Sequence, residues 1–301
     1  EAGGSISELA AIVAVTDDGG SSGRLRDELQ MLPPGDIRNC MVALSEDSQT
    51  LSKLFRHRFR GDGDLGGHVF GNIFLAALSE VTGDFAEAVK LSSEILASKG
   101  HIYPATGADV RLAAELIDGK VVRGETKVGH VGGMIKRVFL EPSDCEPLPE
   151  AVAAIRSADV ISVGPGSLYT SLLPPMLVRG LASAIAESRA RKIFISNLMT
   201  QPGETDTLSL AGHIDVLQAC APGVKFDCIV VNSQPITDSQ VKKYAGEGSE
   251  QVGLREVSEA SEIAGARLVY DNLLNAGEKV RHDPYRLAKA ALRCAVEPFT
   301  L

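Results

Sequence analysis

Four apolar runs in this chain each end in a segment rich in glycine, hydroxyl, amide or carboxylate side chains, and this pattern restricts the fold most strongly. The runs are residues 9–15, 159–163, 192–195 and 226–231. Short continuous apolar runs are typical of strands buried in a parallel sheet, and helical periodicity between the later runs indicates β/α alternation. We therefore predict an α/β fold. In open sheets of this kind ligands bind beyond the carboxyl ends of the strands, where all four polar segments would lie.

The first polar segment, residues 16–26, combines carboxylates, glycines, hydroxyls and arginines. Glycines let backbone N–H groups turn toward an anion, while hydroxyl and guanidinium groups add donors. Asp17 and Asp18 can hold Mg²⁺ or a sugar hydroxyl. A flexible polar loop is the plainer alternative. We favour a phosphate-binding segment because a solvated loop gains nothing from so many donors.

A second polar segment is Pro-Pro-Gly-Asp at residues 33–36. Its prolines end any preceding helix, and Asp36 is placed to cap a helix over about residues 37–55. Arg38 and Asn39 lie in the first turn of that helix, where anions are favoured. A stiff loop and a helix cap explain the same residues equally well, so both interpretations stay open.

Residues 56–72 contain a basic run, a glycine- and aspartate-rich loop and the start of another helix. We interpret the basic run, residues 56–60, as a solvated face. His68 and Asn72 flank a glycine-lined helix start and are ligand candidates.

The pattern changes near residue 105. Asp118-Gly119 separates two strand-like runs, which is a strong hairpin signal, and residues 135–140 are a candidate third strand. We predict an antiparallel insertion over about residues 105–142 within a single domain that covers residues 1–301. An edge extension of the main sheet is the favoured interpretation; a cover for the site or an oligomer contact is the alternative.

The polar segments of the second half follow two neighbouring strands. Residues 164–171 (Gly-Pro-Gly-Ser-Leu-Tyr-Thr-Ser) match neither a Walker A motif nor GxGxxG, but their place between a strand and a helix favours binding of an anion or a sugar. In residues 196–205, Asn197 and Gln201 offer amides for a base edge or sugar hydroxyls, and Glu204 suits a metal or a helix N-terminus.

Charge and composition limit the class of protein. The formal net charge of −9 and the pI of about 5.3 argue against general binding of nucleic acid or anionic membranes. The five cysteines show neither zinc-site spacing nor a disulfide framework. We find no run of membrane-spanning length and no signal-peptide pattern, and we expect a cytoplasmic protein.

Four motifs together resemble a known family: residues 17–26, 33–39, 164–171 and 197–205. In this order they are similar to the gluconeogenesis factor branch of the bacterial 2-phospho-L-lactate transferase (CofD-like) family, over nearly the whole chain. The resemblance implies a Rossmann-like three-layer α/β/α fold with a mostly parallel sheet. It also implies a cytoplasmic protein that binds UDP-N-acetylglucosamine or UDP-glucose and is linked to carbon metabolism, cell shape and wall synthesis. Partners in wall synthesis or regulation and a homo-oligomer are further expectations.

The resemblance also implies roles for particular residues. Tyr244, in Tyr-Ala-Gly-Glu-Gly, and Arg281, in Arg-His-Asp, match UDP-sugar contacts of the family. The family begins with a strand and a Gly-Gly-Gly-Thr-Gly loop, and we expect that segment to lie upstream of Glu1. The transferase branch joins a phospholactyl group to a deazaflavin with Mg²⁺, which makes an Mg²⁺-dependent transferase the alternative function, with Asp17 and Asp18 as metal ligands.

Motifs and resemblance together give one set of candidate ligand-binding residues. The set is Asp17, Asp18, Gly19, Gly20, Ser21, Ser22, Gly23, Arg24, Asp36, Arg38, Asn39, His68, Asn72, Gly164, Gly166, Ser167, Tyr169, Ser171, Asn197, Gln201, Tyr244 and Arg281.

Overall fold

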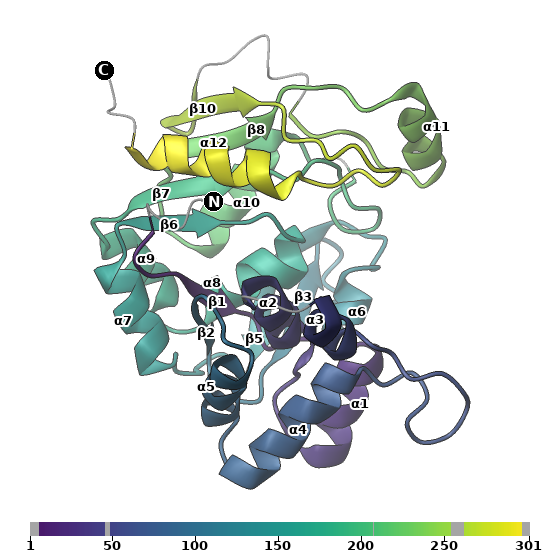
Figure 1. The fold of residues 1–301 in the computed structure, drawn as a ribbon. Helices are drawn as coiled ribbons and strands as arrows, with labels where there is room; N and C mark the ends of the chain where they lie inside the picture. Colours follow the sequence, from purple (N-terminus) through teal and green to yellow (C-terminus); the bar gives the residue numbers. More distant parts are fainter. Residues whose placement is uncertain (1–5, 46–48, 207, 254–261, 297–301) are drawn as a thin grey trace.

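The computed structural model describes residues 6–45, 49–206, 208–253 and 262–296 and confirms the α/β fold (Figure 1). The larger sheet has the order β6 (Val160–Val163), β7 (Arg191–Ile195), β8 (Cys228–Asn232), β10 (Ala266–Asp271) and β9 (Glu262–Ile263). β6, β7, β8 and β10 are parallel, and only β9 is antiparallel to its neighbour. Helix α12 (Pro284–Val296) crosses one face of this sheet in Figure 1.

Alternate residues of the central strands point into two different cores, as the period of two in a strand requires. One core lies under α12 and includes Ile193, Ile195, Val230, Ala290 and Cys294. The other lies on the opposite face, where Phe194, Ile229 and Val231 pack with Ile214 and Leu217 of α10 (Leu210–Cys220). Both faces of the sheet are therefore covered, which explains why its strands read as continuous apolar runs.

The first half of the chain forms a separate parallel pair, β1 (Ala10–Val13) with β2 (His101–Pro104). Five helices follow β1: α1 (Gly20–Leu29), α2 (Gly35–Leu44), α3 (Gln49–Phe55), α4 (Phe70–Thr82) and α5 (Phe85–Ile95). The prediction of one helix over residues 37–55 was wrong, because the backbone is extended at Ser45, where α2 ends. Residues 46–48 lie outside the described part of the chain.

Helix α1 changes the interpretation of the first polar segment. The helix begins at Gly20, so most of residues 16–26 are helical rather than loop, and Gly19 is the cap residue. Gly23 lies against the Asp18 carbonyl: a Cβ there would be 2.1 Å from that oxygen. Only glycine allows the helix to approach the preceding strand end this closely.

The predicted hairpin is confirmed, but it belongs to a sheet of its own. β3 (Arg111–Leu116) pairs antiparallel with β4 (Val121–Arg123) on one side and with β5 (Ile135–Glu141) on the other. The expected edge extension of the main sheet was wrong, since among the described residues β4, β3 and β5 pair only with one another and none of them pairs with a strand of the larger sheet. A short helix, α6 (Glu125–Val128), follows β4.

Short helices follow the insertion. After α7 (Pro149–Ser157), the apolar stretch that begins at residue 168 forms a π-helical turn, η1 (Leu168–Leu172), then α8 (Leu173–Leu177) and α9 (Leu181–Glu187). Gly180, with a φ of 81°, separates the last two. Helix α11 (Asp238–Gly246) lies at the end of the larger sheet toward which its parallel strands point (Figure 1).

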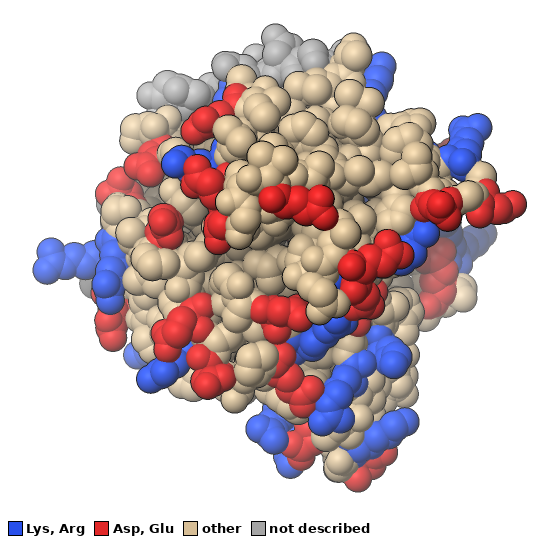
Figure 2. Space-filling view, turned by 90° about the horizontal axis from the view of Figure 1, so that it is seen from below, with Lys and Arg blue, Asp and Glu red and all other residues tan. Residues whose placement is uncertain are grey.

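The described surface carries charges of both signs. Acidic and basic side chains are interspersed over the face seen in Figure 2. Within the described residues, the structure contains no helix long and apolar enough to cross a membrane.

A buried arginine connects α1 to two other segments. Arg26 is 1% exposed, and its Nε lies 2.9 Å from Oδ1 of Asp109. Its terminal nitrogens also donate to the carbonyl oxygens of Thr16 and Val110. Arg26 is therefore a structural residue that holds the end of the first strand segment against the start of β3.

We expect Arg26→Met to lower the free energy of unfolding by about 2–4 kcal/mol, because two buried carbonyls lose their donor. Urea unfolding followed by circular dichroism measures this. Arg24→Met is the control, because Arg24 is exposed and donates only to the Gly66 carbonyl. Equal losses in the two variants would contradict the structural role of Arg26.

Candidate functional site

A hydrogen-bond network joins four of the predicted site residues. Ser21 Oγ lies 3.2 Å from His68 Nδ1 and accepts from Asn72 Nδ2 at 3.2 Å. Arg38 Nε donates to Asn72 Oδ1 at 2.9 Å. The network holds the first turn of α1 against the starts of α2 and α4, so the structure brings together residues that are up to 51 positions apart.

The hydroxyls of the first segment point inward. Ser21 and Ser22 are both buried, and Ser22 Oγ accepts from the Gly35 N–H at 2.8 Å. We expected these hydroxyls to add donors for a phosphate, but they hold α1 to neighbouring segments instead. What the segment offers is the N-terminus of α1, which has no side-chain cap and no acidic residue in its first turn. Backbone N–H groups at such an end favour an anion.

Cationic side chains gather beside this helix end. Burial lowers the pKa of Arg38, and the charges of Arg58 and Arg56 lower it further. Burial and the charge of Arg24 lower the pKa of His68, with Arg58 acting in the same direction. We did not predict Arg56 and Arg58 as site residues from the sequence, because we assigned residues 56–60 to a solvated face. The only signal was the density of arginine before a glycine-rich loop.

Carboxylates gather near the same segment. Burial raises the pKa of Asp36, and the charge of Asp17 raises it further. Burial also raises the pKa of Glu125 to about 8, with smaller contributions from Asp36, Asp17 and Asp18, while a hydrogen bond from Thr16 opposes the shift. Glu125 was not predicted, since it comes from the insertion and approaches residue 16 only in the folded chain.

Asp36 has a different role from the one predicted. Helix α2 begins at Gly35, with Pro34 as its cap residue, so Asp36 lies inside the first turn and does not cap the helix. A carboxylate in that turn is favoured by the helix dipole. Asn39, which is exposed, forms a hydrogen bond that lowers the pKa of Asp36 against the effect of burial.

The two adjacent aspartates each have partners in the protein. Asp17 Oδ1 accepts from the Gly19 N–H at 2.9 Å. Asp18 Oδ1 accepts from the N–H and the hydroxyl of Thr126, at 2.9 and 2.6 Å, and so caps α6. Among the described residues, no group of three or more His, Cys, Asp or Glu side chains is placed to hold a metal ion. An Mg²⁺ ion would share these aspartates with their present partners, and its site stays a prediction.

The insertion links the two halves of the site. Thr126 contacts Asp18, and the charge of His130, four residues further on, acts on Glu204. His130 lies two residues beyond the end of α6, so Asp18 contacts the start of this short helix and Glu204 lies near the turn that follows it. Gly203 also packs on this stretch, where a Cβ would be 3.5 Å from the His130 Cα.

The two polar segments of the second half are bonded to each other, as expected for adjacent strand ends. Gln201 Nε2 donates to Ser167 Oγ at 2.6 Å, and Glu204 Oε1 accepts from the Tyr169 N–H at 2.8 Å. A Cβ at Gly164 would meet the Ile195 carbonyl oxygen at 2.7 Å. Because Glu204 already satisfies the start of η1, that helix end is a poorer phosphate site than α1. Gly166 and Ser171 belong to the same polar segment, residues 164–171. The ligand role of each stays a prediction.

The two residues carried over from the family lie near each other. The Tyr244 hydroxyl accepts from the Val280 N–H at 3.0 Å, next to Arg281. The Arg281 side chain is exposed, and its carbonyl accepts from the Asn275 N–H at 2.9 Å. Tyr244 therefore anchors the segment that presents Arg281 at the carboxyl end of the sheet.

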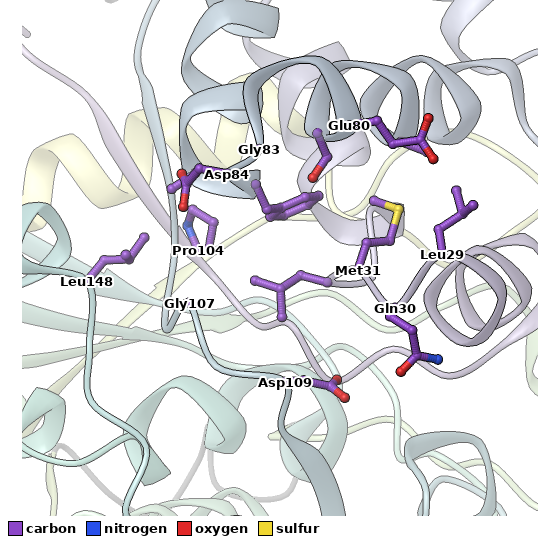
Figure 3. A pocket seen from close by; sticks show the side chains of 15 residues that line it. Leu29, Gln30, Met31, Glu80, Gly83, Asp84, Pro104, Gly107, Asp109 and Leu148 are labelled. Carbon is purple, nitrogen blue, oxygen red and sulfur yellow. The ribbon is translucent and has the colours of Figure 1, made fainter.

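A cavity of about 380 Å³ lies elsewhere, between the end of α1 and the turn that joins α4 to α5 (Figure 3). Met31, Asp84 and Leu148 are among its lining residues, and none of the 22 predicted site residues lines it. The cavity is therefore separate from the candidate site.

Comparison with known proteins agrees with these motifs. A family model described as 2-phospho-L-lactate transferase CofD matches residues 3–274. The chain belongs to this family. It is 44% identical over 286 residues to a protein named gluconeogenesis factor from Halalkalibacterium halodurans, covering 94% of this chain and 88% of that protein. It is also 44% identical over 282 residues to the gluconeogenesis factor of Bacillus subtilis, covering 93% and 88%.

Other relatives show how far the likeness extends. The chain is 46% identical over 288 residues to a protein from Nostoc sp. but covers only 63% of that longer protein. A crystal structure of a Bacillus halodurans protein, described as a member of the UPF0052 family, has a TM-score of 0.88 and 44% identity, covering 95% of this chain and 91% of that one. Family and fold predictions are thereby confirmed, whereas the individual ligand contacts stay predictions.

The raised pKa of Glu125 makes stability depend on pH. Its folded-state pKa of about 8 exceeds the ordinary 4.5, so the folded state binds the proton more tightly. This stabilisation is complete below pH 4.5 and is lost as the pH rises through 8.

We expect the free energy of unfolding to fall by about 2–4 kcal/mol between pH 5 and pH 8.5, and Glu125→Gln to remove most of that fall. Urea titrations across this range measure it. Glu115→Gln is the control, because hydrogen bonds from Lys136 and Arg137 lower the pKa of Glu115, so it titrates below the range. An unchanged pH dependence in Glu125→Gln would contradict the assignment.

Proposed function

We propose that this protein binds a nucleotide sugar, UDP-N-acetylglucosamine or UDP-glucose, and acts as a regulatory protein rather than through a reaction of its own. The observation that carries the proposal is the uncapped N-terminus of α1 beside Arg24, Arg38, Arg58 and His68. Cations that lower one another's pKa favour an anion between them, and the diphosphate of a nucleotide sugar is such an anion.

The other part of the site suits the remainder of the ligand. Asn197 and Gln201 present amides at the carboxyl end of β7, and Tyr244 positions the segment that carries Arg281. Amides and hydroxyls recognise sugar hydroxyls and base edges. The name gluconeogenesis factor, borne by relatives with 44% identity, supports a role in carbon metabolism. A cytoplasmic location, a homo-oligomer and partners in wall synthesis belong to the same proposal.

Isothermal titration calorimetry with UDP-N-acetylglucosamine tests the proposal. We expect binding by the unaltered protein and a loss of about tenfold or more in Arg281→Ala, because an exposed guanidinium that contacts a diphosphate or a sugar is removed. Arg286→Ala is the matched control, since Arg286 is also exposed and lies one turn into α12. No heat with the unaltered protein, or equal affinity in the two variants, would contradict the proposal.

The acidic group of Asp17, Asp18, Asp36 and Glu125 favours a second candidate, an Mg²⁺-dependent transferase of the phospholactate type. Burial raises the pKa values of Asp36 and Glu125, and neighbouring carboxylates raise them further; a divalent cation would offset that repulsion. We expect such an enzyme to form product from a deazaflavin and a guanylylated phospholactate donor, and Asp17→Asn to abolish it. Chromatography of the reaction mixture measures this, and absence of product with Mg²⁺ present would remove the candidate.

A further inference from the structure

Several buried polar atoms at the carboxyl end of β7 lack hydrogen-bond partners among the described residues. They are Ser196 Oγ, Asn197 Oδ1, Gln201 Oε1 and His282 Nε2. The Ser196 side chain is 1% exposed and that of Asn197 is 8% exposed. Buried polar atoms in folded proteins are nearly always hydrogen-bonded, so a cluster of exceptions points to a missing partner.

His282 lies against Ser196, although the two residues are far apart in sequence. The backbone of Ser196 forms a hydrogen bond with the imidazole, while burial lowers the pKa of His282 and so favours the neutral ring. Since Nε2 is the nitrogen without a partner, the ring bonds the Ser196 carbonyl through Nδ1–H. This hydrogen-bond pattern assigns the tautomer and leaves a lone pair on Nε2.

The unpartnered atoms share one chemical character. Nε2 in this tautomer and the two amide oxygens only accept hydrogen bonds, and the Ser196 hydroxyl can do so. A partner that carries donors therefore satisfies all four atoms. Diphosphate oxygens are acceptors, whereas sugar hydroxyls and the N–H of a base are donors.

We propose that Ser196 and His282, with the amide oxygens of Asn197 and Gln201, bind the donor-bearing sugar or base of the ligand. The diphosphate then lies toward the N-terminus of α1, which fixes the direction of the ligand in the site. This rests on the proposed nucleotide-sugar function and adds two residues, Ser196 and His282, that the sequence did not indicate. His282 adjoins Arg281 in the segment that Tyr244 anchors.

The test compares two ligands by calorimetry: UDP-N-acetylglucosamine, and inorganic pyrophosphate, which has neither sugar nor base. We expect His282→Phe to lower the affinity for the nucleotide sugar about tenfold and to leave pyrophosphate binding unchanged. His282→Gln, which keeps an acceptor, should retain part of the affinity. Because His282→Phe also removes the Nδ1–H donor to the Ser196 carbonyl, the melting temperature of each variant is measured beside its affinity. A loss confined to the nucleotide sugar, with pyrophosphate binding kept, is a result that a purely structural histidine would not give.

Ser196→Ala has a matched control in Ser98→Ala. Ser98 Oγ is also buried without a partner, but Ser98 pairs with Ser45 in the first half of the chain. We expect several-fold weaker sugar binding in Ser196→Ala and none of this loss in Ser98→Ala.

The outcomes separate this inference from the function on which it rests. If the unaltered protein binds no nucleotide sugar, the proposed function and this inference both fail. If it binds, and His282→Phe and Ser196→Ala bind equally well, the function stands and the inference fails, with water as the only partner of these atoms. Equal losses for pyrophosphate and nucleotide sugar would overturn the assigned direction.

Discussion

The contact on which the site depends is the one between Asp18 and Thr126, which are 108 residues apart. One carboxylate oxygen accepts two hydrogen bonds and caps α6 from another part of the chain. A charge-assisted bond of this kind is among the stronger ones in proteins. It brings the insertion against the end of the first strand segment. The turn after α6 then places His130 near Glu204. The insertion therefore borders both the first polar segment and residues 201–205.

Charged side chains of both signs surround the first turn of α1. Burial and the charges of neighbouring arginines lower the pKa values of Arg38 and His68, while burial and neighbouring carboxylates raise those of Asp36 and Glu125. The charges of Asp36 and Arg38 also act on each other, so the two groups border one another. Perturbed pKa values of this kind cluster at functional sites. An anion beside the arginines, or a bound proton or cation beside the carboxylates, would reduce the repulsion within each group.

The sequence predicted the parts of this architecture that depend on local chemistry. The strand ends, the Asp118-Gly119 hairpin and the motifs of residues 164–171 and 197–205 all follow from neighbouring residues, and their positions agree with the structure. The start of α1 at Gly20 was missed because three glycines read as a loop, although Gly23 is needed for a close contact inside a helix. Glu125, Arg58 and His282 could not be found in the same way, since their partners lie far away in sequence and only the folded chain shows which polar atoms remain unpaired.

A crystal structure of the protein saturated with UDP-N-acetylglucosamine tests the central claim most directly. We expect diphosphate oxygens within hydrogen-bonding distance of the backbone N–H groups in the first turn of α1, with the sugar or base against Ser196 and His282. A ligand bound in the opposite direction, or in the separate cavity beside Met31, would contradict it.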